Sequence, residues 1–246
     1  MKKVLIEALY GEYSNLYGDQ GNLLYVQEKL RRAGVEYDLI RTHLFDRPAF
    51  ADRAVDFLYI GPCTERQQEQ ELEHLRPYAQ ALRQRMESGA VTLVTGNALE
   101  LLGESIRCED GREIRGLGFY KTTAQRFSHL RYNELCMGYC GENILVGFKN
   151  QLSHSYGETG SPFLLMHTGT GLNPETKNEG FRHGNFIATY LLGPFLVLNP
   201  RFTQYLLQLL GCETPPAFWK EAMEAYEYRL RGLETPGVCF LVGEHG

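Results

Sequence analysis

Short apolar runs alternate with amphipathic stretches through the first hundred residues, and this alternation limits the possible fold more than any other feature of the sequence. The apolar runs predict buried strands at 4–9, 35–40, 55–60 and 91–94. The amphipathic stretches predict helices at 20–33 and 65–88, the second bent or restarted at Pro77. Strands that alternate with helices form a mostly parallel sheet with helices on both faces. We therefore predict an α/β fold.

The second half of the chain is richer in predicted strands. A turn at 108–112 predicts a hairpin, and short strand-like runs occur at 117–121, 144–148, 163–166 and 186–191. We expect this strand-rich half to extend the same sheet. Proline-containing segments at 199–200 and 214–216 then predict two C-terminal helices. Because no linker or internal repeat separates these parts, residues 1–246 are predicted to form one domain.

Charge and composition exclude several classes of partner. The chain has 25 Lys and Arg against 30 Asp and Glu, a net charge of -5, so we expect no nucleic-acid partner. Its apolar runs are far shorter than the ~20 residues of a transmembrane helix, so no membrane insertion is expected. The six scattered cysteines predict reduced thiols in the cytoplasm. Cys136 and Cys140 have a zinc-ligand spacing but are explained as well by a sheet core, and no phosphate-binding glycine motif is present, so we assign no cofactor and no metal.

Residues 91–103 predict a strand that ends in a tight turn and opens a helix. In α/β enzymes such a turn often holds a nucleophile above the carboxyl edge of the sheet. The residue at that place is Gly96, which has no side chain. From this segment alone, the glycine is explained at least as well by a turn that needs a positive φ.

A series of short segments adds a family resemblance. In chain order they are Tyr17-Gly18-Asp19-Gln20-Gly21-Asn22, 60–68, 94–103, Gly116-Leu117-Gly118, Gly147-Phe148-Lys149-Asn150-Gln151, and 178–200. Together they resemble the class I glutamine amidotransferases of the cobyric acid synthase-like type, and most closely the GatD-like glutaminase subunits. The resemblance covers about residues 4–210 and leaves 211–246 as a C-terminal helix and tail. It implies a single-domain, flavodoxin-like fold and a Mur-ligase-like partner that amidates peptidoglycan precursors.

The departures from this family concern its chemistry. Its members attack the amide of glutamine with a cysteine thiolate and use a histidine to activate that cysteine. The resemblance places the cysteine position at Gly96 and the histidine position at Leu192, so neither catalytic group is present. It also places Pro62, which has no N–H, in the glycine-rich segment that stabilises the oxyanion. We therefore hypothesise a GatD-like subunit that lacks glutaminase activity and serves as partner or scaffold of the amidating enzyme.

Other residues keep further hypotheses open. The resemblance suggests Gly61, Arg66 and Arg131 as substrate-binding residues, the arginines because a guanidinium suits the carboxylate of an amino acid. Cys63 lies beside the predicted turn and is a candidate for a relocated nucleophile, although a small buried thiol is the simpler interpretation. The alternatives are thus an active subunit that hydrolyses L-glutamine through Cys63, and a regulatory module that binds glutamine or a related amino acid. The apolar tail at 238–242 could dock a partner or finish the core.

Overall fold

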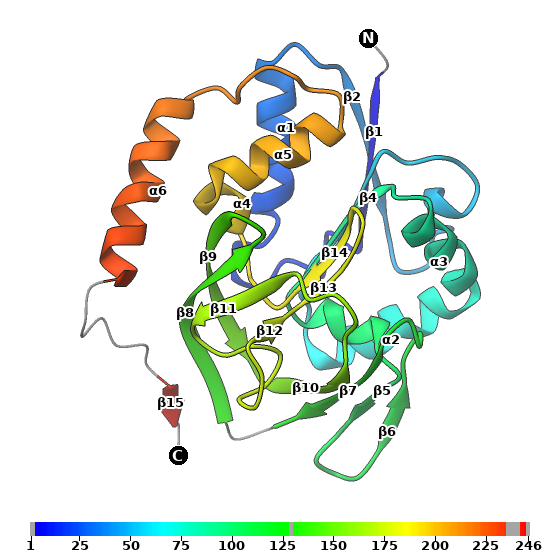
Figure 1. Cartoon of the computed structure of the whole chain (residues 1–246). Helices are drawn as coiled ribbons and strands as arrows, with labels where there is room; N and C mark the ends of the chain where they lie inside the picture. Colours follow the sequence, from blue (N-terminus) through cyan, green and yellow to red (C-terminus); the bar gives the residue numbers. More distant parts are fainter. Residues whose placement is uncertain (1–2, 128–129, 235–241, 245–246) are drawn as a thin grey trace.

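A six-stranded sheet forms the centre of the computed structural model, which describes residues 3–127, 130–234 and 242–244 (Figure 1). Its strand order is β13-β14-β4-β3-β1-β2. Every neighbouring pair is parallel except β13 and β14. The strands are β1 (Val4–Leu9), β2 (Tyr37–Thr42), β3 (Phe57–Ile60), β4 (Val91–Thr95), β13 (Phe181–His183) and β14 (Phe186–Thr189). This confirms the predicted α/β fold with a mostly parallel sheet.

Helices cover both faces of this sheet, which explains why its inner strands are buried along their whole length. On one face lie α1 (Gly21–Arg32), α4 (Phe195–Leu198) and α5 (Pro200–Leu209), whose apolar side chains share a core with β1. On the other face lie α2 (Glu65–Leu75), α3 (Ala79–Glu87) and the 3₁₀ helix η4 (Gly96–Leu102). Figure 1 shows α1 and α5 on one side of the sheet and α2 and α3 on the other.

The long predicted helix at 65–88 is interrupted where proline requires it. The helix α2 begins with a capping box, in which the Thr64 side chain accepts from the Gln67 backbone and the Gln67 side chain accepts from the Thr64 backbone. The short 3₁₀ helix η3 (Arg76–Tyr78) contains Pro77 and separates α2 from α3. The predicted restart at Pro77 is confirmed.

We expected the strand-rich second half to extend the central sheet. Of its described strands, β13 and β14 join that sheet, whereas the others form two further sheets. One contains β5 (Ser105–Arg107), β6 (Glu113–Arg115), β7 (Lys121–Arg126) and β10 (Ser153–Glu158). The other contains β8 (Leu130–Cys140), β9 (Asn143–Gln151), β11 (Leu164–Thr168), β12 (Asn178–Glu179) and β15 (Val242–Glu244). The hairpin at 108–112 is confirmed between β5 and β6. The predicted strand at 117–121 is wrong apart from its last residue, which begins β7.

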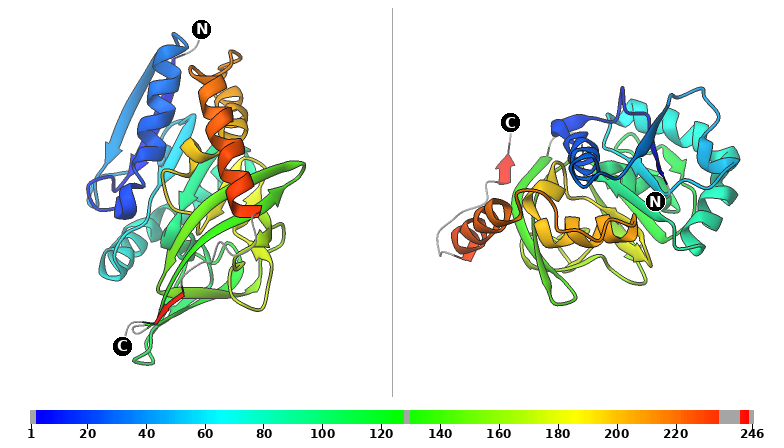
Figure 2. Two further views of the ribbon diagram at one scale, coloured as in Figure 1. Left: turned by 90° about the vertical axis from the view of Figure 1, so that its left-hand side faces the viewer. Right: turned by 90° about the horizontal axis from the view of Figure 1, so that it is seen from above.

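The last helix, α6 (Trp219–Glu234), packs outside the second of these sheets rather than on the central one (Figure 2). Tyr226 donates a hydrogen bond to the carbonyl of Ile144 at 2.7 Å, and Met137 and Val146 contact the same apolar cluster. Most of the predicted apolar tail at 238–242 lies outside the described residues. Among the helices that the structure describes, none has the length and apolar character that crossing a membrane requires.

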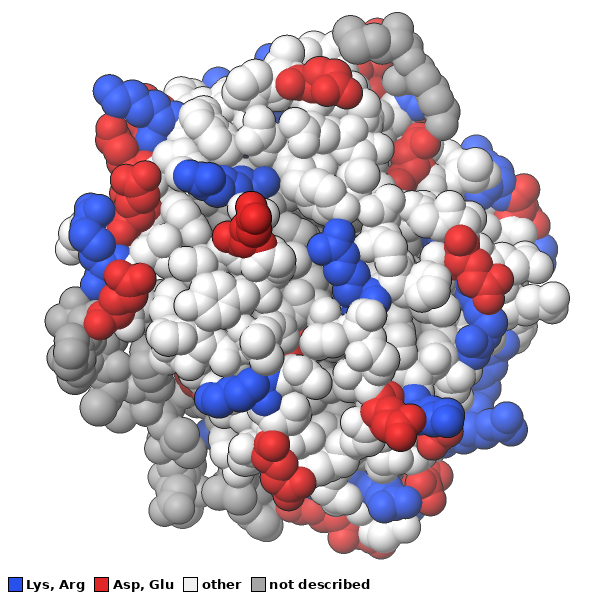
Figure 3. Space-filling model, in the orientation of Figure 1, with Lys and Arg blue, Asp and Glu red and all other residues white. Residues whose placement is uncertain are grey.

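Charged side chains of both signs are interspersed over the face of the molecule in Figure 3. Lysines and arginines alternate with acidic residues, and no extended basic area occupies that face.

Candidate functional site

The turn after β4 has the tight strand-to-helix geometry that the sequence predicts around Gly96. The strand ends at Thr95, and Gly96 follows with a φ of +59° as the first residue of η4. This left-handed conformation costs a non-glycine residue ~1–2 kcal/mol. The turn lies at the carboxyl end of a central parallel strand, where α/β proteins place their sites. The left-handed backbone at this turn is thus adopted by glycine, the residue for which it costs least.

Two apolar side chains fill the space that a side chain at Gly96 would need. A Cβ atom built on Gly96 would lie 2.5 Å from Cβ of Pro62 and 2.8 Å from Cδ2 of Leu192. Leu192 is only 2% exposed. The structure thus brings together the three positions that the sequence singled out, and it packs them against one another. We call Gly96, Pro62 and Leu192 the plug.

A buried carboxylate, Asp19, holds the two segments that carry the plug. It accepts hydrogen bonds from the Thr95 hydroxyl at 2.5 Å and from the backbone N–H of Gly193, so it joins the residue before Gly96 to the residue after Leu192. The Tyr59 hydroxyl and the Asn22 amide also donate to it. Burial raises the pKa of Asp19 to about 6. Because its hydroxyl is committed to this carboxylate, Thr95 is part of the framework of the site.

Replacing Asp19 by asparagine is expected to preserve the fold and to change its pH dependence. An asparagine oxygen can still accept from Gly193, and the Thr95 and Tyr59 hydroxyls can rotate to accept from its NH₂ group. Because the folded-state pKa is raised from 3.8 to about 6, the folded protein binds the extra proton, and the free energy of unfolding falls as pH rises through that window. Between pH 4.5 and 7.5 we expect Asp19→Asn to gain about 2 kcal/mol relative to the wild type.

Urea unfolding at the two pH values measures this difference. Asp19→Leu, which removes every acceptor, serves as the contrast and is expected to lose several kcal/mol at both pH values. If Asp19→Asn and the wild type showed parallel pH profiles, the carboxyl would not titrate in the predicted window.

The loop after β3 offers no free N–H to an oxyanion at residues 62–64. Pro62 has no N–H, and the N–H of Thr64 is taken by the Gln67 side chain in the capping box. The N–H of Cys63 donates to Oδ1 of Asn97 at 3.1 Å, and Nδ2 of Asn97 donates back to the Cys63 carbonyl at 2.8 Å. Asn97 therefore links this loop to the turn at Gly96. The N–H groups of Cys63 and Thr64 both have acceptors within the chain.

Cys63 lies beside the buried carboxyl group of Glu71. Its side chain is 1% exposed, and burial, reinforced by the neighbouring Glu71, raises the pKa of the thiol well above its ordinary value. Glu71 is itself buried and accepts from the Ser14 hydroxyl at 2.6 Å, and burial raises the pKa of Glu71 to about 7. This environment favours the neutral thiol.

A small cavity of about 40 Å³ lies beside the plug. Its lining includes two plug residues, Pro62 and Leu192, together with polar side chains from several elements. Besides Pro62 and Leu192, the residues that line the cavity are Leu16, Tyr17, Cys63, Glu65, Gln68, Asn97, Glu100, Arg126, Asn150, Gln151, Leu152, Ser153 and Tyr190. A single water needs at least about 10–15 Å³ measured in this way. The cavity therefore has room for a few water-sized molecules.

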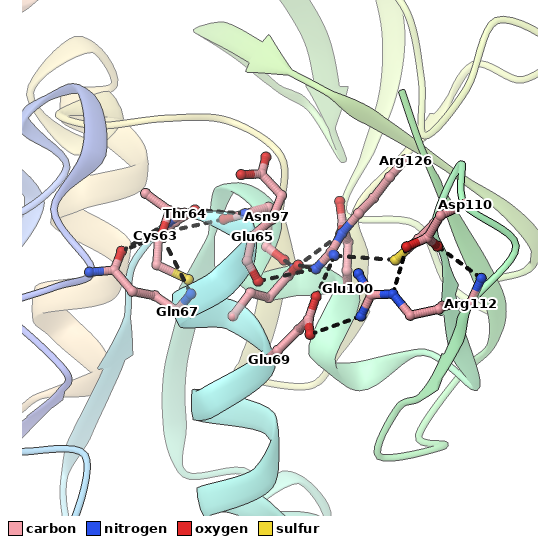
Figure 4. Close-up of polar contacts among 12 residues, drawn as sticks. Cys63, Thr64, Glu65, Gln67, Glu69, Asn97, Glu100, Asp110, Arg112 and Arg126 are labelled. Atoms are coloured by element: carbon pink, nitrogen blue, oxygen red, sulfur yellow. Dashed lines mark hydrogen bonds and ion pairs between the residues drawn. The ribbon is translucent and has the colours of Figure 1, made fainter. Parts of the chain in front are cut away.

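The arginine at this cavity is Arg126, which the sequence reasoning did not single out. Its guanidinium donates to Oε1 of Glu69 at 2.8 Å (Figure 4). It also donates to Oε1 of Gln68 at 2.7 Å. The Gln68 amide in turn donates to Oε2 of Glu100 at 3.0 Å and to the Asn97 carbonyl at 2.6 Å. The amide of Gln68 thus bridges the guanidinium and the buried carboxylate of Glu100. These hydrogen bonds commit Arg126 to partners within the chain.

The other arginines that the sequence suggested lie elsewhere. Arg66 is exposed on α2, beside Glu69 and Arg115 in a separate surface cleft, and Arg131 is exposed on β8. Neither lines the cavity. Gly61 is buried directly after β3, where a Cβ atom would lie 2.6 Å from the carbonyl oxygen of Ser14. The glycine is required there because two backbone segments approach closely.

The two closely spaced cysteines lie on one strand, β8, and point to different surroundings. Cys136 is buried in the core, and burial raises its pKa. Cys140 is half-buried, and Arg182 donates to its sulfur at 3.4 Å. Within residues 3–127, 130–234 and 242–244, no group of three His, Cys, Asp or Glu side chains is arranged to hold a metal ion.

Residues 8–200 match the family described as the CobB/CobQ-like glutamine amidotransferase domain. Since this match spans most of the chain, the protein belongs to that family. A glutamine amidotransferase from Thermotoga maritima has the same fold, with a TM-score of 0.50 and 10% sequence identity over 95% of each chain. The predicted resemblance to class I glutamine amidotransferases is confirmed.

Within this family the chain is similar to GatD, the subunit of a glutamine-hydrolyzing lipid II isoglutaminyl synthase. It is 26% identical over 215 residues to GatD of Staphylococcus aureus (strain N315), which covers 87% of this chain and 86% of the relative. It is also 26% identical over 215 residues to GatD of Streptococcus pneumoniae (strain ATCC BAA-255 / R6), which covers 82% of this chain and 78% of that relative. The GatD-like character predicted from the segments is therefore confirmed.

Proposed function

We propose that this chain is a GatD-like subunit whose glutaminase site is closed, and that it acts as partner or scaffold of an amidating enzyme. The observation that carries the proposal is the plug. A nucleophile at position 96 would have to share its space with Pro62 and Leu192, at 2.5 and 2.8 Å from its Cβ atom. Both distances are shorter than van der Waals contact between carbon atoms. Pro62 and Leu192 are therefore packed too closely around Gly96 to admit a side chain there.

Two further observations support the loss of glutamine hydrolysis. Arg126, the guanidinium at that cavity, is already paired with Glu69 and hydrogen-bonded to Gln68. The N–H groups at Cys63 and Thr64 have partners within the chain, and Pro62 has none to offer. Nucleophile, substrate anchor and oxyanion donors are each affected, and groups that act as a unit lose most of their catalysis together.

The relatives support the proposed partner. GatD is named as one subunit of lipid II isoglutaminyl synthase, and it aligns with this chain over most of both lengths. We propose that this chain, as one domain over 1–246 in the cytoplasm, binds a Mur-ligase-like synthetase subunit. There it would stabilise that enzyme or shape its site while amidation uses ammonia from another source.

Glutamate release from L-glutamine is the direct test. The purified chain, alone and co-expressed with a Mur-ligase-like synthetase from the same genome, is expected to release no glutamate above the rate without protein. A stable complex is expected from the co-expression. A Cys63→Ala variant is run in parallel and is expected to behave like the wild type.

Two results would replace the proposal. Activity that disappears in Cys63→Ala, with a stoichiometric adduct of a glutamine-mimicking electrophile on Cys63, would establish a relocated nucleophile. Calorimetric binding of glutamine or a related amino acid without hydrolysis, and without a recoverable complex, would establish an amino-acid-binding regulatory module instead.

A further inference from the structure

Residues 15–18 form a short segment along one wall of the cavity beside the plug. Both Leu16 and Tyr17 line that cavity. The segment is held at its two ends by fully buried residues: Ser14, which donates to Glu71 at 2.6 Å, and Asp19, which holds Thr95 and Gly193. Between these anchors Asn15, Tyr17 and Gly18 are exposed. The arrangement is that of a narrow strap with buried ends and an exposed middle.

Two hydrogen bonds tie the strap across the cavity. The N–H of Leu16 donates to the Pro62 carbonyl at 3.3 Å, which is long for such a bond. The Tyr17 hydroxyl donates to Oδ1 of Asn150 on β9 at 2.8 Å. Asn150 donates in turn to Asn133 on β8, which fixes its orientation. The phenol of Tyr17 is therefore the main latch between the strap and the opposite wall of the cavity.

The backbone opposes this latch. Tyr17 has a φ of +59° and a ψ of 23°, a left-handed conformation that is uncommon for a residue with a side chain. The strain of this conformation and the net worth of one exposed hydrogen bond are of similar size. The closed arrangement is thus only weakly preferred at this point. We propose that residues 15–18 are a flap that opens the cavity to solvent, with the Tyr17–Asn150 hydrogen bond as its latch.

The chain supplies its own reporters of opening. Cys63 lines the cavity under the flap and is 1% exposed, so a reagent reaches its thiol only when the cavity opens. Cys136 is equally buried but lies in the core, where it reports unfolding. Cys140 is half-buried on the far end of β8 and reports the intrinsic reactivity of an accessible thiol.

The experiment measures alkylation of each cysteine by iodoacetamide at one fixed pH, followed by peptide mass spectrometry. In Tyr17→Phe the latch is lost while the ring remains. We expect Cys63 to react about three- to tenfold faster than in the wild type, the factor that one hydrogen bond supplies. Cys136 and Cys140 should react at unchanged rates. Asn150→Ala, which removes the other partner, should accelerate Cys63 in the same way.

Tyr13→Phe is the matched control, since Tyr13 is 46% exposed against 43% for Tyr17 but does not line the cavity. It should leave all rates unchanged. Equal Cys63 rates in Tyr17→Phe and wild type would overturn the flap. So would a parallel acceleration of Cys63 and Cys136, because it would mean that the whole fold loosens. The alkylation rates depend neither on glutamine hydrolysis nor on a partner. The flap can therefore be refuted or supported independently of the proposed function.

Discussion

Replacing Gly96 by cysteine is expected to destabilise the protein by about 2 to 5 kcal/mol and to produce no glutaminase. One contribution is the left-handed backbone, with a φ of +59°. The other is steric, because the new Cβ atom would meet Pro62 and Leu192 at 2.5 and 2.8 Å. Denaturant unfolding measures the loss, and glutamate release measures the activity.

Gly34→Cys separates the two contributions. Gly34 also has a positive φ, +69°, but a Cβ atom there would have no neighbour within 4 Å. We expect it to lose only the backbone part, ~1–2 kcal/mol. The excess loss at Gly96 is then the cost of the plug.

A double-mutant cycle tests the plug directly. Pro62→Gly removes the nearest carbon atoms, so Pro62→Gly with Gly96→Cys should lose less stability than the sum of the single variants, by about 1 to 3 kcal/mol. Strict additivity would mean that Pro62 does not obstruct position 96, and the argument for a closed site would fail.

Replacing Lys149 by methionine is expected to cost about 3 to 5 kcal/mol, the effect of breaking a buried ion pair from one side. Lys149 is fully buried, and its Nζ donates to the carbonyls of Thr170 and Gly171 at 2.6 and 2.9 Å. The carboxylates of Glu134 and Glu179 lie 3.9 and 4.0 Å from it. Methionine fills a similar volume but leaves both carboxyl groups without a cation.

The loss should depend on pH in a defined direction. Burial already raises the pKa of Glu179, and the charge of Lys149 counteracts this. Without Lys149 the pKa rises further, so the folded variant binds a proton that the unfolded chain releases, and its stability improves as pH falls from 7 toward 5. The deficit of Lys149→Met relative to wild type should therefore shrink at pH 5. Lys121→Met, at an exposed lysine, is the control and should change stability by less than about 0.5 kcal/mol at both pH values.

The same buried charges explain why the second half of the fold was hard to predict. The strand β8 buries Glu134 on its inner side and leaves Leu135 and Tyr139 exposed on its outer side, at 47% and 41%. A buried glutamate and two exposed apolar side chains in one strand blur the apolar and polar alternation, so no strand at 130–140 was predicted. Lys149 on the neighbouring strand supplies a cation near Glu134, and that pairing depends on the register of β8 with β9.

The arginine at the cavity was not predicted for a similar reason. Sequence reasoning suggested Arg66 and Arg131, whereas the structure places Arg126 at the cavity. Arg126 lies at the end of β7 opposite Ser153 of β10, another cavity residue. Which arginine reaches the cavity is decided by the pairing of strands 27 positions apart, and no local pattern records that pairing.

What the sequence determined by itself was local or a matter of residue identity. Periodicity predicted the central strands and helices, because burial of one helical face or of a whole strand repeats along the chain. The absence of a thiol at position 96 and of an imidazole at position 192 also follows from the residues alone. Tertiary structure decided the rest: that Pro62 and Leu192 fill the space over Gly96, that Gln68 and Glu69 occupy Arg126, and that Tyr17 lines the cavity. These contacts join residues far apart in the chain, so they exist only once the sheet and its helices have packed.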